Sequence, residues 1–143
     1  MKINKTVSLE TAKLLVEKGI DLSKETKYGY AELCAVKIEL IEIKDIKDYI
    51  FWQNHKVTNL FAAPDIPELL AELPIFADED EDYKLRITKC KDGYQVSYID
   101  YNGRIYQGRD GSEDWYFYHE ELVEALAQAL MWVRSKAEVK NER

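Results

Sequence analysis

The spacing of apolar positions near the start of the chain predicts a short helix that begins after Ser8. Ser8 is a good N-cap because its hydroxyl can accept a hydrogen bond from a free backbone N–H of the first turn. Gly19 can adopt the left-handed conformation that ends a helix, which would place Ile20 against Leu15 in a Schellman motif. The apolar positions with helical spacing are Leu9, Ala12, Leu15 and Val16.

The pattern is less clear between about residues 26 and 60. Val36, Ile38 and Leu40 alternate with polar residues, which predicts a half-buried strand. The alternation slips at Leu40–Ile41, as it would at a β-bulge. A helix could also account for the apolar positions, but the density of β-branched side chains favours a strand. Residues 49–52 have the composition of another short strand.

Two further helices are indicated by the residues at their ends. Asp65 and Glu68 have the spacing of a capping box, and Pro74 would stop the helix that they begin. The last helix is predicted over residues 119–136, with acidic residues in its first turn and basic residues in its last. Residues 137–143 are expected to fray. The buried stripe of the last helix consists of Leu122, Val123, Leu126, Leu130 and Val133.

The clearest signal for a sheet lies between residues 83 and 107. Apolar and polar residues alternate over 83–88 and again over 94–98, with a turn that contains Gly93 between them. Asn102-Gly103 is a strong hairpin signal, so residues 104–107 are predicted to return as the third strand of a meander. The run from Trp115 to Tyr118 is either a fourth strand or packs against the start of the last helix.

These elements predict an α+β fold in which about three helices pack on one face of an antiparallel sheet of four to six strands. The meander over residues 83–107 is expected at the centre of that sheet. A length of 143 residues suits one domain, so residues 1–143 are expected to form a single α+β domain.

Composition and charge narrow the possible functions. The net charge of −7 disfavours a general binder of phosphate backbones and suits a basic protein partner. No signal-peptide pattern and no run of about 18 apolar residues occurs, so a cytoplasmic protein is expected. The chain contains 10 Tyr and 3 Trp, an excess that either fills the core or forms a contact surface.

No sequence motif for catalysis, metal binding or cofactor binding is present, so no cofactor is expected. Cys34 and Cys90 have no metal-ligand spacing, and a nucleophilic pair of Cys90 with His119 has no motif to support it. The acidic run that begins at Asp78 departs from an EF-hand loop, because Tyr83 occupies the sixth position, which requires Gly. Glycine-rich phosphate-binding motifs are absent from the sequence.

Two groups of residues are candidates for binding a partner protein. The first is an acidic run expected to form a solvated loop: Asp78, Glu79, Asp80, Glu81 and Asp82. The second is aromatic, and would be a partner site if it stayed exposed: Trp52, Trp115 and Tyr116. An alternative is a basic and aromatic strand face that binds single-stranded nucleic acid, formed by Lys84, Arg86 and Lys89 with Tyr101.

Four segments follow one another along the chain in a familiar order: Val7–Leu15 with Lys18-Gly19-Ile20, Ala63–Leu70, Tyr94–Tyr98, and Glu124–Leu130. In this order they resemble small hypothetical proteins carried by phages and prophages of Bacteroides-type gut bacteria. The resemblance implies a bacterial cytoplasm and a mobile genetic element. That family has no assigned activity, so the resemblance implies no catalytic residues.

The function expected from these observations is that of a non-enzymatic phage or prophage accessory protein that recognises a protein partner through an acidic surface. Inhibitor-like and immunity-like proteins belong to this class. The alternatives are a nucleic-acid-associated protein that uses the basic strand face and an enzyme whose site is not recognisable from sequence. The partner and the oligomeric state are left open by the sequence.

Overall fold

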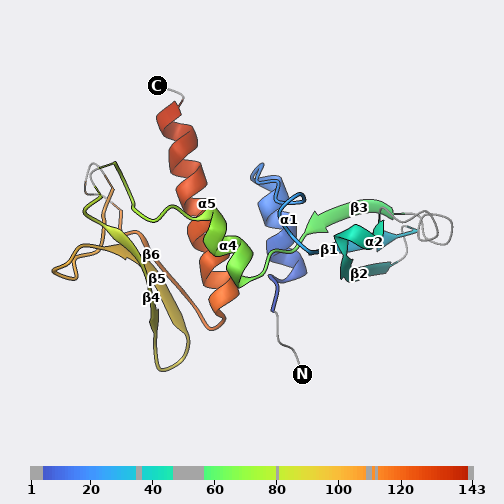
Figure 1. The fold of residues 1–143 in the computed structure, drawn as a ribbon, viewed down its shortest axis with the longest axis horizontal. Helices are drawn as coiled ribbons and strands as arrows, with labels where there is room; N and C mark the ends of the chain where they lie inside the picture. Colours follow the sequence, from blue (N-terminus) through green and yellow to red (C-terminus); the bar gives the residue numbers. More distant parts are fainter. Residues whose placement is uncertain are drawn as a thin grey trace. The chain divides into compact units, whose positions relative to one another are not determined.

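The computed structural model describes residues 5–34, 37–46, 57–79, 81–108, 111 and 113–141 (Figure 1). The chain divides into two compact units, Met1–Glu68 and Leu69–Arg143. Within the described residues, each unit contains one three-stranded antiparallel sheet, and helices complete each unit. The predicted α+β class is therefore confirmed, with its six described strands divided between two sheets. The organisation as a single domain stays a prediction.

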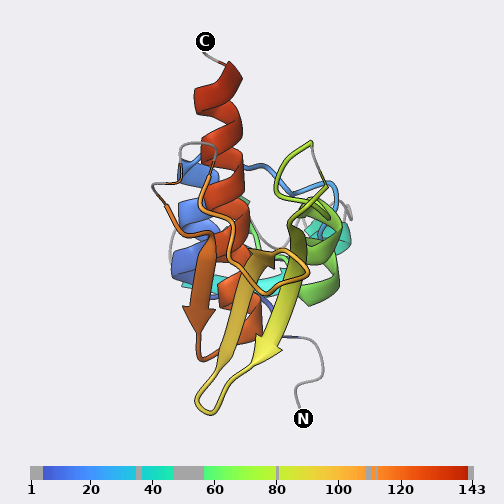
Figure 2. The ribbon, with the colours of Figure 1, turned by 90° about the vertical axis from the view of Figure 1, so that its left-hand side faces the viewer.

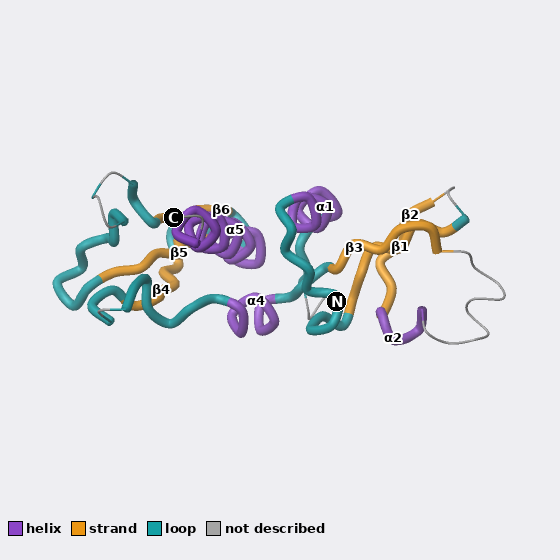
Figure 3. Tube along the Cα trace, turned by 90° about the horizontal axis from the view of Figure 1, so that it is seen from above, coloured by secondary structure: helices purple, strands orange, loops and turns teal. Residues whose placement is uncertain are grey.

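The first unit is built around a sheet whose central strand comes first in the sequence. The strand order is β2-β1-β3, and β1 pairs antiparallel with both neighbours. In Figure 3 these strands lie side by side, with α2 on one side of them. The elements are α1 (Leu9–Glu17), β1 (Tyr28–Leu33), β2 (Lys37–Glu42), α2 (Ile43–Ile46), β3 (Val57–Ala62) and the start of α4 (Ile66–Glu72).

Both ends of α1 and the start of α4 follow the local sequence signals. The Ser8 hydroxyl accepts a hydrogen bond from the Thr11 N–H at 3.2 Å. Gly19 has a φ of +77°, and the Ile20 N–H donates to the Leu15 carbonyl at 2.9 Å, which completes the Schellman motif. The predicted capping box of α4 is also confirmed: the Asp65 and Glu68 backbone N–H groups each donate to the other side chain at 3.0 Å.

In the middle of the first unit, the structure confirms only some of the predictions made from the sequence. The predicted strand is present as β2, so the helical alternative does not apply to Lys37–Glu42. The predicted bulge at Leu40–Ile41 is wrong, because the register of β1 with β2 is unbroken from Tyr28↔Glu42 to Leu33↔Lys37. The alternation slips inside β2 because Ile41 packs against the buried Ala31 and Leu33, whereas Leu40 points to the opposite face and is 44% exposed. The strand predicted over residues 49–52 lies outside the described residues.

The second unit packs one long helix on one face of its sheet. The strand order is β4-β5-β6, and α5 contacts β5 and β6. Figure 2 shows the three strands in front of α5, so the helix covers one face of the sheet and the other face points away from it. The elements are β4 (Lys84–Lys89), β5 (Tyr94–Ile99), β6 (Tyr116–His119) and α5 (Leu122–Asn141).

The third strand of this sheet is not the one that the hairpin signal predicts. The turn at Asn102-Gly103 forms, with a φ of +85° at Gly103, but residues 104–107 contribute an isolated bridge at Ile105 and no strand. β6 takes the third position instead. The returning segment enters the core at Tyr106, which is 6% exposed. The Tyr106 N–H donates to the Tyr98 carbonyl, and the Tyr106 carbonyl accepts from the Trp115 N–H, both at 2.8 Å.

An aromatic cluster forms part of the core of the second unit. The Tyr106 and Trp115 ring centroids lie 4.8 Å apart at an interplanar angle of 83°, and those of Tyr98 and Trp115 lie 5.8 Å apart. The Tyr98 hydroxyl donates to the Pro74 carbonyl at 2.7 Å, and burial raises the pKa of this phenol above its usual range. Part of the tyrosine and tryptophan excess is therefore core, where edge-to-face packing stabilises it.

Candidate functional site

The acidic run closes a short hydrogen-bonded hairpin ahead of β4. The Ala77 N–H donates to the Tyr83 carbonyl at 2.9 Å, and the Leu85 N–H donates to the Ile75 carbonyl at 2.8 Å. The described residues of the acidic run therefore follow and precede positions that are joined by backbone hydrogen bonds. We call the described acidic residues of this turn the acidic tip: Asp78, Glu79, Glu81 and Asp82. Asp80 lies outside the described residues.

The conformation of Glu81 is unusual for its residue type. Its φ is +60°, in the left-handed region that favours glycine and costs other residues roughly 1 kcal/mol or more. Its side chain is exposed, as are those of Glu79 and Asp82, while Asp78 is half-buried. A carboxylate therefore occupies a position where glycine would fit the backbone better.

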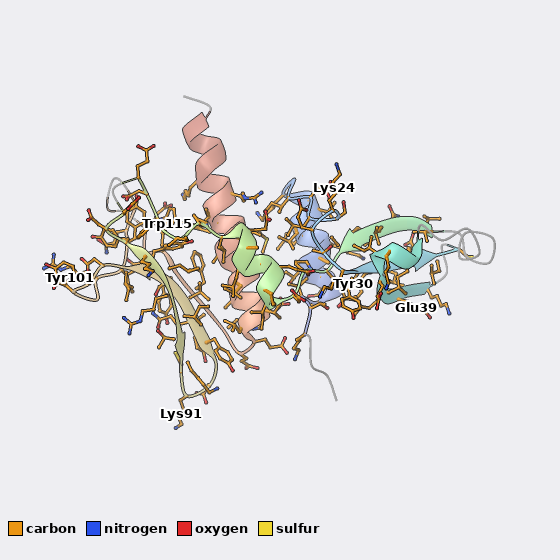
Figure 4. The ribbon with its side chains drawn as sticks, in the orientation of Figure 1. Lys24, Tyr30, Glu39, Lys91, Tyr101 and Trp115 are labelled. Atoms are coloured by element: carbon orange, nitrogen blue, oxygen red, sulfur yellow. The ribbon has the colours of Figure 1, made fainter. Side chains whose placement is uncertain are left out.

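The aromatic candidates do not form one surface. Trp115 belongs to the core cluster and is 6% exposed, so its indole is not available to a partner. Figure 4 shows Trp115 surrounded by neighbouring side chains of this unit. Its neighbour Tyr116 is 44% exposed, because consecutive side chains of an extended segment point to opposite faces. Trp52 lies outside the described residues.

The second unit also presents an exposed sheet face, which we call the outer face because it lies opposite α5. Cross-strand pairing aligns Arg86 with Ser97 and Ser97 with Tyr116. The next row aligns Thr88, Gln95 and Tyr118. Tyr116 and Tyr118 are 44% and 40% exposed, respectively. The position of Tyr118 on the same face as Arg86, with β5 between their strands, was not apparent from the sequence, because only the register of the sheet creates it.

Two members of the basic face expected from the sequence lie elsewhere. Lys89 shares the opposite face with Tyr94, since it is an odd number of residues from Arg86 along the same strand. Its ammonium group lies 4.6 Å from the Tyr94 ring centroid. Tyr101 follows β5 in the turn and is 97% exposed, pointing away from the sheet in Figure 4. Of the four predicted residues, Lys84 and Arg86 remain on the outer face.

No hydrogen bond joins Cys90 to His119, both of which the structure describes. The Cys90 thiol donates to the Thr88 carbonyl at 3.9 Å. The Nδ1 atom of His119 accepts a hydrogen bond from the Glu121 N–H at 2.9 Å, which occupies that nitrogen at the start of α5. Among the described residues, no group of three or more His, Cys, Asp or Glu side chains is placed to bind a metal ion.

The first unit contains an open apolar hollow between the end of α1 and β3. The polar side chains beside it are Asp21 and Ser23, and the Ser23 N–H donates to the Asp21 carboxylate at 3.0 Å. Hydrogen bonds from Ser23 lower the pKa of Asp21. These polar groups therefore satisfy each other and do not converge on a ligand position. The hollow is lined by Leu15, Val16, Gly19, Ile20, Leu22, Leu60 and Ala62.

No protein-family model, curated protein or solved structure matches this chain. The resemblance to phage-borne hypothetical proteins therefore stays a prediction. Within the described residues, none of the helices has the length and apolar character needed to cross a membrane. What the structure establishes is the α+β fold, with the exposed acidic tip and the exposed outer face both on the second unit.

Proposed function

We propose that this chain is a non-enzymatic binding protein that recognises a basic protein surface through the acidic tip. The observation that carries this proposal is the geometry of the tip, a turn closed by hydrogen bonds on both sides that keeps Glu81 in a left-handed conformation. A turn held in this way presents its carboxylates with a smaller loss of entropy on binding than a flexible acidic tail would.

The distribution of charge supports this proposal. The sequence of the second unit contains 16 Asp and Glu residues against 10 Lys and Arg, whereas the first unit contains 11 against 10. The negative charge of the chain is thus concentrated in the unit that carries the acidic tip. A field of this kind increases the rate at which a basic partner arrives, by roughly tenfold or more at low salt.

The biological setting that we propose rests on the resemblance described above. In that setting the chain is an accessory protein of a phage or prophage, acting in the cytoplasm of a bacterial host. An inhibitor-like or immunity-like role fits an acidic binding surface, because many such proteins act by covering a basic site on another protein. The identity of the partner is a matter for experiment.

The proposal can be tested by titrating the full chain with a lysine-rich peptide and measuring affinity by calorimetry at low salt. The tip variant carries Glu79→Gln, Glu81→Gln and Asp82→Asn, and the control carries Glu10→Gln, Glu17→Gln and Glu25→Gln. Both variants lose the same charge at exposed positions. We expect the tip variant to bind about tenfold more weakly and the control to bind nearly as wild type. Equal losses in both variants would show that only the net charge matters.

A further inference from the structure

The three strands of the second unit differ in charge from the rest of that unit, which is acidic. Their sequences contain three basic residues and no Asp or Glu, although the chain has 27 acidic residues. Lys84 and Arg86 are exposed and make no ion pair with the described residues. The outer face is therefore a cationic surface within an acidic unit.

The register of the sheet places an aromatic side chain across from the arginine. Ser97 lies between Arg86 and Tyr116 in one cross-strand row and is 1% exposed, whereas both of its neighbours are exposed. Adjacent strands are about 4.8 Å apart, so the Cα atoms of Arg86 and Tyr116 are separated by about 10 Å. Because Ser97 is almost fully buried, the exposed surface of this row is formed by the side chains of Arg86 and Tyr116.

The two exposed tyrosines have the spacing needed to contact neighbouring groups of an extended chain. Tyr116 and Tyr118 are two residues apart on β6 and point to the same face, about 7 Å from one another. Desolvation and, to a smaller extent, the Asp92 carboxylate raise the pKa of Tyr118. Asp92 makes this end of the face less favourable for an anion than the end at Arg86.

Charged residues on edge strands also prevent sheets from joining at their edges. Arg86 lies on such a strand, although a bridge between Lys84 and Phe76 pairs the start of its outer edge. That role requires charge alone. It does not account for tyrosines aligned across a small central residue, nor for the absence of acidic side chains on all three strands. The combination of cations on one side and aromatic rings on the other is the arrangement by which proteins hold single-stranded nucleic acid.

We propose that the outer face of the β4–β5–β6 sheet binds a short segment of single-stranded nucleic acid. Lys84 and Arg86 would contact phosphates along β4, and Tyr116 would stack on a base, with Tyr118 beside the next one. This site has the opposite charge preference to the acidic tip and does not depend on it. The acidic surroundings restrict contact to a few nucleotides and disfavour duplex DNA, whose charge density is higher.

The test is fluorescence anisotropy of the full chain with a labelled oligothymidine of about 12 nucleotides, within the usual range of site sizes. Binding should weaken with salt with a slope of about −1.4 in log–log form, as expected for two phosphate contacts on a single strand. The variant Arg86→Gln should reduce that slope to about −0.7. Tyr116→Ala should weaken binding about tenfold or more, and Tyr116→Phe should restore it because the ring remains.

Matched controls separate this site from general electrostatics. Lys89→Gln removes the same charge as Arg86→Gln but on the opposite face, and Tyr101→Ala removes a fully exposed tyrosine outside the strands. Neither control should change affinity more than about twofold. The tip variant should bind the oligonucleotide at least as well as wild type, because it removes repulsion; this keeps the result separate from the outcome for the acidic tip.

Three results would overturn the proposal. The first is no measurable binding of the oligonucleotide at low salt. The second is an equal loss of affinity in Lys89→Gln and Arg86→Gln, which would mean that no particular face is used. The third is tighter binding of a glutamate-rich peptide than of the oligonucleotide with the same dependence on Arg86 and Tyr116, which would identify the occupant as an acidic peptide.

Discussion

The two sheets of this protein have the same number of described strands but use their side chains differently. In the first sheet the strands carry acidic and basic side chains, and some of these form hydrogen bonds or ion pairs within the sheet. The Glu32 carboxylate accepts hydrogen bonds from Thr58 and Asn59, and Lys37 pairs with Glu39 at 3.0 Å. The second sheet carries charge of one sign only, which the described residues leave unpaired at Lys84 and Arg86.

The buried clusters that pack against the two sheets also differ, in the kind of side chain that they contain. The first is aliphatic, with Ala31 and Leu33 buried on the central strand, whereas the second contains Tyr98, Tyr106 and Trp115. Aromatic side chains bury more area and make oriented contacts, so the second core fixes the positions of its strands more tightly. The comparison teaches that the sheet packed on an aromatic cluster is also the one whose strands carry basic residues without ion pairs among the described residues.

The largest expected effect is the loss of stability when a buried side chain is removed from each of the two cores. Tyr98→Ala should cost about 4 kcal/mol of unfolding free energy, because it removes a fully buried ring and its hydrogen bond to Pro74. Leu33→Ala in the first sheet should cost about 3 kcal/mol. Both values are obtained from urea unfolding monitored by circular dichroism. A smaller cost at Tyr98 than at Leu33 would contradict the view that the aromatic core is the tighter one.

The second prediction compares a glycine in each half of the molecule. At Gly93 an added Cβ would lie 2.5 Å from the His119 carbonyl oxygen and 2.9 Å from the Glu120 Cα, both backbone atoms. At Gly29 the closest atom would be the end of the Leu60 side chain at 2.8 Å, which can move. We expect Gly93→Ala to cost about 2–3 kcal/mol and Gly29→Ala about 1 kcal/mol in the same unfolding experiment. Equal costs would mean that the turn before β5 moves as easily as a side chain.

The third prediction concerns the helix starts of the first unit. Asp65→Ala removes one of the two reciprocal hydrogen bonds at α4 and should cost about 1–2 kcal/mol, since Asp65 is 4% exposed. Ser8→Ala at α1 should cost about 1 kcal/mol or less, because that cap is exposed. Asp65→Asn is the control, since it keeps an acceptor at the cap. A smaller loss at Asp65 than at Ser8 would contradict the expected effect of burial.

The smallest expected effects are those of ion pairs. Arg134 and Glu72 are 2.8 Å apart with side chains that are 40% and 24% exposed, whereas those of Lys37 and Glu39 are 62% and 47% exposed. Double-mutant cycles should give a coupling of about 0.5–1 kcal/mol for the first pair and close to zero for the second. Both couplings should decrease at high salt. A larger value for the Lys37 pair would show that exposure does not determine the difference.

The features predicted correctly from the sequence are those whose causes are local. Ser8 and Gly19 mark the two ends of α1 because capping involves residues within one turn. Asp65 and Glu68 mark the start of α4 for the same reason. The alternation over β4 and β5 and the glycine turn between them also depend on near neighbours. The position of the acidic run was likewise evident, because consecutive carboxylates are expected in solvent.

The features that the sequence did not predict depend on partners far along the chain. β1 was missed because Gly29 and Ala31 are small where neighbouring side chains pack closely against the strand. A strand over residues 115–118 was one of two alternatives, but its place beside β5, where residues 104–107 were expected, was not predicted. The candidate nucleic-acid surface has the same origin. The sequence by itself determined that Lys84 and Arg86 alternate on one strand and that an acidic run precedes it. Only the tertiary structure decided that Tyr116 aligns with Arg86 across Ser97, because strand register follows from which side chains the core can bury.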